Sequence, residues 1–398
     1  MPELGPVGAL TVAAIGLLVM AVSRTSLRTL PIFFDPLTPP IRWPAALSIA
    51  ATLSGGMVAI NLLAELPSCA DSDLRGVTRL GDECAAFDLA ASSAGVAPAL
   101  AVVQREQGRI RVFARGAQGR LSSPALHDVQ TSRGAPEEIV ALPSAGRFLV
   151  TSIPEDFAER STTLLDLPMD EGGHLGAQID VPCWVSSTLW SPDTARLLLG
   201  CEASPHLYEY DPITRKLDQR ADFTPTGTLG DVEDLSLQDW GPPLGQRLYS
   251  VSLSPGHRLR ELDASSGELI RHLDIGGFSY SVVGDPQRGE LYISRFYESS
   301  VLVVDAWAMR PLRRLRASFG VRALASLPSL RVLASTSMFH NHLDLRSLDD
   351  GRLLRRLRLG GQNKSLELGE DGRSLLLSTS CGTYEVDVEE VLAHGDSS

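Results

Sequence analysis

The feature that most constrains this chain is a repeated pattern of short apolar runs and turns between residues 67 and 398. Each copy ends its third run on an anchor residue, and successive anchors are 53, 45, 52, 42, 41 and 41 residues apart. The anchors are Phe113, Asp166, Asp211, Asp263, Asp305, Arg346 and Asp387. A period of about 40–50 residues that holds several short strands is the sequence pattern of β-propeller blades.

Turn signals rich in Gly, Pro, Ser and Asp form a second series with the same period. They lie at Ser93–Gly95, Ser144–Gly146, Ser191–Asp193, Pro242–Gly245, Asp285–Gly289, Pro328–Ser329 and Glu370–Gly372. Each is followed by a run of β-type composition, as at Arg147–Thr151 and Glu290–Ser294, and glycine supplies the positive φ that tight turns need. Seven turns and seven anchors predict an all-β domain over residues 85–392. We expect a seven-bladed propeller with four antiparallel strands per blade, in preference to six or eight blades.

A propeller ring usually closes with a strand from the other end of the chain. The run Asp73–Leu80 is the candidate, and we expect it to complete the last blade beside Thr383–Val388. Closure removes exposed strand edges that would otherwise favour aggregation. Residues 67–84 are therefore predicted to be a linker and ring-closing strand, and residues 393–398 a disordered tail.

The later copies carry a family resemblance. Gly284–Ser294 with Val301–Asp305, and also Gly361–Ser378, resemble the YVTN-type repeat of lactonase-like and quinoprotein-like propellers. The resemblance covers roughly residues 85–390 and is strongest over residues 263–390. It implies the fold alone, because no active-site motif of the family is present and propellers host many functions.

Two long uncharged runs precede the repeats. Leu4–Val22 has 19 residues and Pro44–Ala64 has 21, and each is long enough for a helix to cross a bilayer core of about 30 Å. We expect a membrane anchor over residues 1–66, with transmembrane helices at about residues 4–23 and 44–64.

The loop between the two runs carries Arg24, Arg28 and Arg42. Positive loops favour the cytoplasm, so the hairpin predicts a propeller on the periplasmic or extracytoplasmic side of the cell inner membrane. An alternative is a lipoprotein anchored at Cys69, because Leu66-Pro-Ser-Cys69 resembles a lipoprotein cleavage box.

The net charge of −12 lies entirely in residues 67–398, which hold 33 basic and 45 acidic side chains. An acidic domain repels phosphate backbones, so we expect no nucleic-acid partner. We also expect no resident cofactor.

The five cysteines form no C-x-x-C pair, which excludes the usual zinc-ribbon and redox motifs. Cys183 and Cys201 fall on two strands of one predicted hairpin and are disulfide candidates. Pairs among Cys69, Cys84 and Cys381 remain open.

Candidate binding residues come from the loops between second and third strands and between blades, where propellers usually bind their ligands. Arg295, Phe296 and Tyr297 combine Arg with aromatic side chains, a composition favoured at interfaces. The loops also contain four histidines: His206, His257, His340 and His342.

A metal site is the weaker hypothesis for these loops. His340, His342 and Asp344 alternate along an extended chain and could offer two imidazoles and a carboxylate to a transition metal. A predicted turn interrupts that alternation, and no further ligand is evident, so we expect no bound metal.

Motifs for phosphate binding, zinc proteases and serine hydrolases are absent from the sequence. We expect a non-enzymatic binding or scaffold module that recognises a protein, peptide or envelope polymer. Two alternatives stay open: a metal-assisted lyase or hydrolase with its site in the axial funnel, and a sensor or assembly subunit of a membrane complex.

Overall fold

The computed structural model describes residues 71–394 except 82–87, 93–98, 117–120, 123, 132–133, 155–160, 170–175, 177, 203, 224–230, 253–256, 341, 361–364, 370 and 380. The predicted membrane hairpin and the Cys69 lipidation site lie outside these residues. Within the described part of the chain, no helix has the length and apolar character needed to cross a membrane.

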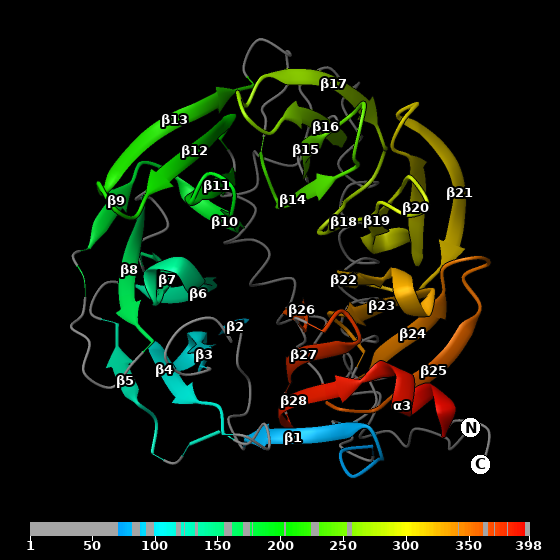
Figure 1. The fold of residues 1–398 in the computed structure, drawn as a ribbon, viewed down its shortest axis with the longest axis horizontal. Coiled ribbons are helices and arrows are strands. Elements are labelled where there is room, and N and C mark those ends of the chain that lie inside the picture. Colours follow the sequence, from blue (N-terminus) through cyan, green and yellow to red (C-terminus); the bar gives the residue numbers. More distant parts are fainter. Residues whose placement is uncertain are drawn as a thin grey trace, which may run out of the picture. The chain divides into compact units, whose positions relative to one another are not determined.

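Seven four-stranded antiparallel sheets stand side by side around a central axis (Figure 1), which confirms the predicted seven-bladed propeller. Six of the sheets are meanders that start at the axis and end at the rim, and in the seventh the outermost strand comes from the other end of the chain. Blade 1 contains β2 (Asp88–Ser92), β3 (Ala99–Gln104), β4 (Arg109–Ala114) and β5 (His127–Gln130). Blade 2 contains β6 (Ala135–Leu142), β7 (Arg147–Ile153), β8 (Thr162–Pro168) and β9 (Ile179–Val181). Blade 3 contains β10 (Trp184–Ser191), β11 (Arg196–Glu202), β12 (His206–Asp211) and β13 (Lys216–Asp222).

The remaining blades repeat this order. Blade 4 contains β14 (Asp234–Asp239), β15 (Gln246–Val251), β16 (Arg258–Asp263) and β17 (Leu269–Asp274). Blade 5 contains β18 (Val282–Asp285), β19 (Glu290–Arg295), β20 (Ser300–Asp305) and β21 (Arg310–Arg316). Blade 6 contains β22 (Val321–Leu327), β23 (Val332–Ser337), β24 (Leu343–Ser347) and β25 (Leu353–Leu357). Blade 7 contains β26 (Leu366–Leu368), β27 (Ser374–Thr379), β28 (Gly382–Asp387) and β1 (Val77–Gly81).

Strand composition follows the position of the strand in its blade. Middle strands such as β19 are buried on both faces because neighbouring blades pack on either side, and they read as nearly continuous apolar runs. The outermost strand β17 alternates half-buried and exposed residues along Leu269–Asp274, as expected for a strand with one face in water.

The recurring Asp anchor has a local structural cause. Asp211, Asp263 and Asp305 each end a third strand, and one carboxylate oxygen accepts hydrogen bonds from the backbone N–H groups two and three residues later. Such Asx turns satisfy the backbone where the chain reverses into the fourth strand. The repeat visible in the sequence is therefore partly a series of capped turns.

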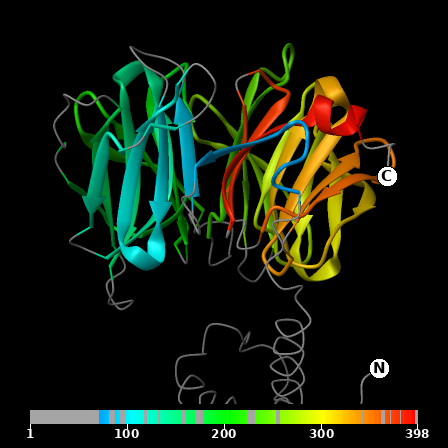
Figure 2. The same ribbon diagram turned by 90° about the horizontal axis from the view of Figure 1, so that it is seen from below.

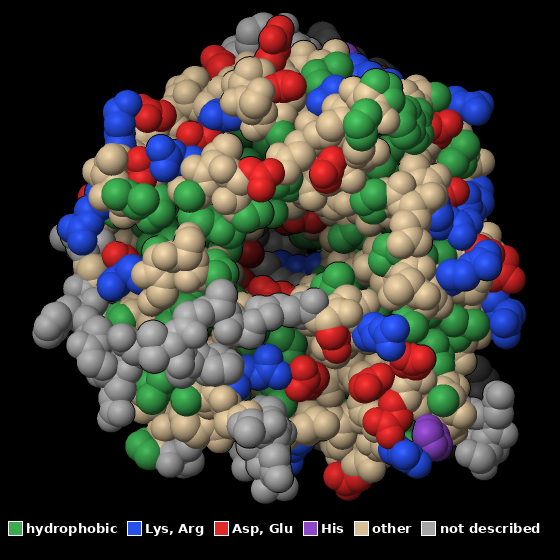
Figure 3. Space-filling view, viewed as in Figure 1, with side chains coloured by type: hydrophobic (Ala, Val, Ile, Leu, Met, Phe, Trp, Pro, Cys, Tyr) green, Lys and Arg blue, Asp and Glu red, His purple; other side chains and the backbone are tan. Residues whose placement is uncertain are grey.

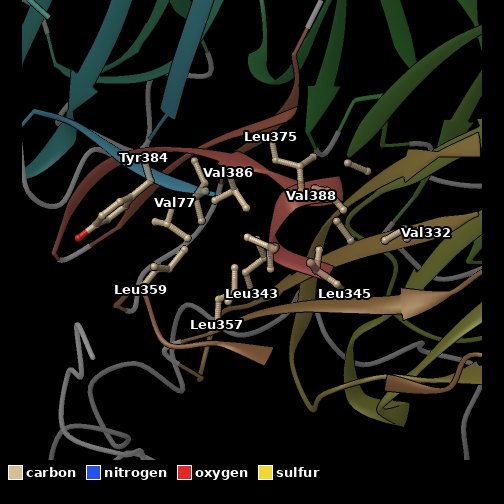
Figure 4. Close-up of a cluster of buried hydrophobic side chains, with 14 of the residues drawn as sticks. Val77, Val332, Leu343, Leu345, Leu357, Leu359, Leu375, Tyr384, Val386 and Val388 are labelled. Carbon is tan, nitrogen blue, oxygen red and sulfur yellow. The ribbon is translucent and has the colours of Figure 1, made fainter. Parts of the chain in front are cut away.

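A strand from the other end of the domain closes blade 7, although it spans Val77–Gly81 and the first four residues of the predicted run, 73–76, form a turn. β1 pairs antiparallel with β28, placing Val77 opposite Val386 and Thr78 opposite Glu385. Val77, Tyr384 and Val386 pack with Leu343 and Leu357 of blade 6 in one buried cluster (Figure 4).

A short helix, α3 (Val388–Ala393), follows β28 in place of further strand. Its N-cap is Asp387, whose side chain accepts from the backbone N–H of Glu390 at 2.9 Å. The sequence did not predict this helix, although Asp followed by Glu389 and Glu390 is a typical helix start.

The two faces of the ring carry different connections. We call the side with the connections between second and third strands and between blades the loop face. Figure 2 shows it at the bottom, with the short helices η1 (Arg105–Gln107) and η4 (Phe296–Glu298), whereas α3 lies at the top.

Cys183, just before β10, forms a disulfide with Cys201 of β11, and their Cα atoms are 5.8 Å apart. This is the predicted pair. Cys381 is disulfide-bonded as well; Cys69 and Cys84 lie outside the described residues.

Candidate functional site in the axial channel and on the loop face

The inner strands of the seven blades surround an axial cavity of about 530 Å³. Figure 3 shows it as a hollow at the centre of the face opposite the loop face, with acidic and basic side chains visible inside it. The described lining comes from all seven blades, so no single motif in the sequence encodes it. Its charged members are Asp88, Glu138, Glu233, Asp234, Arg322 and Glu367.

These charges are unbalanced and lie near one end of the channel. Among the described lining residues, five acidic side chains accompany one guanidinium, that of Arg322. Asp88 and Asp234 are the first residues of β2 and β14, and Arg322 and Glu367 are the second residues of β22 and β26. Because inner strands begin where the preceding blade connects, these side chains lie toward the loop face.

Three of the carboxylates also join neighbouring blades. Asp88 Oδ2 accepts from the backbone N–H of Ile139 in the next blade at 2.8 Å. Asp234 Oδ2 accepts from that of Val282 at 2.8 Å, and Glu367 Oε2 from that of Ala91 at 3.3 Å. These acids therefore have a structural role that does not depend on a ligand.

Enclosure by the blades alters the acidity of two of them. Burial raises the pKa of Asp234 to about 7, although the N–H groups of Val282 and Leu235 oppose the shift. Burial, together with the negative charge of Asp88, raises the pKa of Glu367 to about 8. Both residues are partly exposed. A cation in the channel would therefore stabilise the ionised form of both carboxyl groups.

A second feature is a chain of aromatic rings on the loop face of blades 5 and 6. Phe278 and Phe296 each lie within 5.0 Å of Tyr297, measured between ring centroids. Phe339 lies 5.5 Å from Phe296 and stacks on Phe319 at 5.4 Å. We call these five residues together with Met338 the aromatic patch.

The patch is partly open to solvent. Tyr297 is 57% exposed and Met338 42%, whereas Phe296 is buried. Phe278, Phe319 and Phe339 are half-buried. Contiguous exposed apolar groups of this kind mark interaction surfaces more often than isolated ones do.

The structure divides the predicted Arg295–Tyr297 contact cluster. Phe296 and Tyr297 join the patch. Arg295 is buried and donates to the carbonyl oxygen of Ile275 and to Glu298, so it holds the loop together.

Sequence reasoning did not assemble the other aromatic residues into one patch. Phe278 and Phe319 are 41 residues apart, and Tyr297 and Phe339 are 42 residues apart. The spacing of these aromatic residues, one repeat length apart in consecutive blades, was the sequence signal that could have identified the patch.

The four candidate histidines occupy different surroundings. His257 lies beside Phe278, with ring centroids 5.0 Å apart, at the edge of the aromatic patch. His206 is on blade 3, 3.2 Å from Ser204 Oγ through Nδ1. His340 and His342 stack on each other at 5.2 Å.

His342 and Asp344 belong to a buried hydrogen-bond network. Ser318 Oγ lies 3.0 Å from His342 Nε2 and donates to Asp344 Oδ2 at 2.9 Å, and both Asp344 oxygens accept from Arg356. Burial alone would raise the pKa of Asp344, but the guanidinium of Arg356 and the charge of His342 keep it below its usual value.

This network has the arrangement of neither a hydrolase triad nor a metal site, although its Ser, His and Asp residues could suggest either. Ser318 and Asp344 both approach the same imidazole nitrogen, His342 Nε2, whereas a hydrolase triad needs Ser and Asp on opposite nitrogens. Across the residues the structure describes, no group of three His, Cys, Asp or Glu side chains is placed to hold a metal ion.

Comparisons with known proteins add no family assignment. No protein-family model matches the chain, and no curated protein matches it significantly in sequence. The propeller architecture is shown by the strand topology, and the resemblance to YVTN-type repeats stays a prediction.

Proposed function

We propose that this protein is a membrane-anchored, non-enzymatic binding module of the cell envelope. Its propeller would bind a cationic segment of a protein, peptide or envelope polymer in the axial channel, and the N-terminal 66 residues would hold it at the outer side of the inner membrane. The propeller fold supports a binding or scaffold role, since such folds commonly present sites built from several repeats.

The observation that carries the proposal is the excess of carboxylates in the channel. Five acidic side chains and one Arg are among the described residues that line a cavity of about 530 Å³, which has room for the end of an extended side chain. Attraction between charges is stronger in such an enclosed space than in open water. A lysine or arginine side chain of a partner fits both the size and the charge.

The anchor and the compartment rest on the sequence together with the disulfides. Pro44–Ala64 is long enough to cross a bilayer, and the Cys183–Cys201 disulfide suits an oxidising compartment such as the periplasm. Relationship to the YVTN-type propellers is part of the same proposal.

A labelled four-lysine peptide tests the channel. Full-length protein in detergent should bind the peptide in a fluorescence anisotropy titration. Replacing two lining residues together, Glu138→Gln with Glu233→Gln, should weaken binding about tenfold, because each removes a negative charge from the channel.

The matched control removes the same charge elsewhere. Glu268 and Glu389 are exposed outside the channel, so Glu268→Gln with Glu389→Gln should leave the affinity unchanged. Equal losses in the two double variants would show that the peptide senses only the net charge, and the channel proposal would then be wrong.

A further inference from the structure

Blades 5 and 6 differ in charge from the rest of the chain. Residues 282–358 contain 13 arginines and seven acidic residues, a net charge of +6. The remaining residues contain 23 basic and 41 acidic side chains, a net charge of −18. The basic excess therefore lies on the two blades that carry the aromatic patch.

Exposed arginines accompany the patch. Arg314 has 60% of its side chain exposed and donates to Glu298 at 2.8 Å, next to Tyr297. Arg316 is exposed at the end of β21 nearest the loop face. Tyrosine, phenylalanine and arginine together suit the boundary between water and lipid, where aromatic bodies enter the interface and charged ends stay wet.

The chain also enters the propeller at blade 6. The backbone N–H of Asp71 donates to the carbonyl oxygen of Arg358 at 3.2 Å, and Asp71 Oδ2 accepts from the N–H of Arg358 at 2.6 Å. Arg358 directly follows β25, the outer strand of that blade.

The short tether limits how far blade 6 can lie from a bilayer. The second uncharged run ends at Ala64, and the seven steps from there to Asp71 span at most about 25 Å. An anchor in that run would therefore keep blade 6 close to the lipid surface.

We infer that the aromatic patch rests on an anionic lipid surface, with Tyr297 and Met338 in the interfacial layer and Arg314 and Arg316 facing lipid phosphates. The inference depends on the anchor of the proposed function and adds a second membrane contact to it. Each basic side chain near an anionic leaflet changes partitioning by about fivefold, so two arginines and two exposed apolar side chains suffice to orient a tethered domain.

Hydroxyl-radical footprinting of the full-length protein tests the inference residue by residue. The protein is placed in nanodiscs of phosphatidylcholine alone or of phosphatidylcholine and phosphatidylglycerol at 3:1. Tyr297 and Met338 should oxidise about threefold more slowly in the anionic discs, because the arginines draw the patch onto them. Trp307 is the internal control: it is 46% exposed, and it follows β20 in the turn on the face opposite the loop face. Its oxidation should not change.

Matched variants identify the charges responsible. Arg314→Ser with Arg316→Ser should abolish the difference between the two lipid compositions. Arg310→Ser should preserve it, because Arg310 is exposed at the other end of β21.

Three outcomes overturn the inference. Equal oxidation of Tyr297 and Met338 in both kinds of disc would contradict the contact with anionic lipid without contradicting the anchor. Protection seen only in native membrane vesicles assigns the patch to a protein partner. Failure of the full-length protein to enter discs contradicts the anchor, and the lipid contact with it.

Discussion

At the scale of single residues, the inner-strand acids combine a structural and an electrostatic role. Glu367 accepts a hydrogen bond from blade 1, yet its pKa of about 8 shows that the folded protein disfavours its charged form. An unfolded chain has no such preference, and its glutamate ionises near 4.5. The free energy of unfolding therefore falls as the pH rises from about 4.5 to about 8.

Glu367→Gln should remove this dependence. Glutamine keeps an oxygen that can accept from Ala91 but carries no charge. The variant should match the wild type at pH 5 and be more stable by about 1–3 kcal/mol at pH 8. Chemical denaturation at both pH values measures the difference. Glu268→Gln, at an exposed turn, should show no such trend; a similar gain there would contradict the explanation from burial.

At the scale of elements, the ring depends on how the chain enters β1. Gly76 has φ +83° and its carbonyl oxygen accepts from the N–H of Asp387 at 2.7 Å. A Cβ at this position would lie 2.9 Å from Val391 Cγ2 of α3 and 3.1 Å from the Asp387 carbonyl oxygen. The turn before β1 thus requires a residue without a side chain, for both conformational and steric reasons.

Gly76→Ala should lower the free energy of unfolding by about 2–4 kcal/mol, combining left-handed strain with a clash against α3. Gly146→Ala separates the two causes, because Gly146 has φ +62° with no atom within 4 Å of the added Cβ. That control should cost about 1–2 kcal/mol. Equal losses in denaturant titrations would show that contact with α3 contributes nothing.

At the scale of the whole molecule, the chain divides into an N-terminal part with two uncharged runs and no net charge, and an acidic propeller with one basic sector. The oxidising compartment that the disulfides suggest requires the propeller to lie outside the cytoplasm, whereas the lipid contact requires only that it lie next to the membrane. The three arginines between the two uncharged runs are the sequence basis for this orientation.

Topology reporters test that orientation directly. Alkaline phosphatase, which needs an oxidising compartment, should be active when fused after Ser398 and inactive when fused after Leu30. A cytoplasmic reporter such as green fluorescent protein should give the reverse pattern. Alkaline phosphatase activity at both sites would contradict a cytoplasmic loop, and activity at neither would place the propeller in the cytoplasm.

The repeat period and the blade count could be predicted from local patterns. The closing strand was expected only from the general rule that a propeller ring closes with a strand from the other end of the chain. Asp263 and Asp305 mark capped turns, which depend only on residues two and three positions later. Runs such as Glu290–Ser294 are buried on both faces, and their continuous apolar composition is visible in the sequence. The Cys183–Cys201 pair followed from its placement on one hairpin, whose partner strands are adjacent in the chain.

What the sequence determined by itself was therefore mainly what depends on residues within one repeat, with the short helix α3 as the exception. Only the tertiary structure brought Asp88, Glu138, Asp234 and Glu367 around one axis, and only it separated buried Arg295 from exposed Tyr297. The physical reason is that the channel and the aromatic patch are made by different blades meeting in space. Their contacts join residues about one to six repeats apart, and no local preference of the backbone or of a single strand encodes those distances.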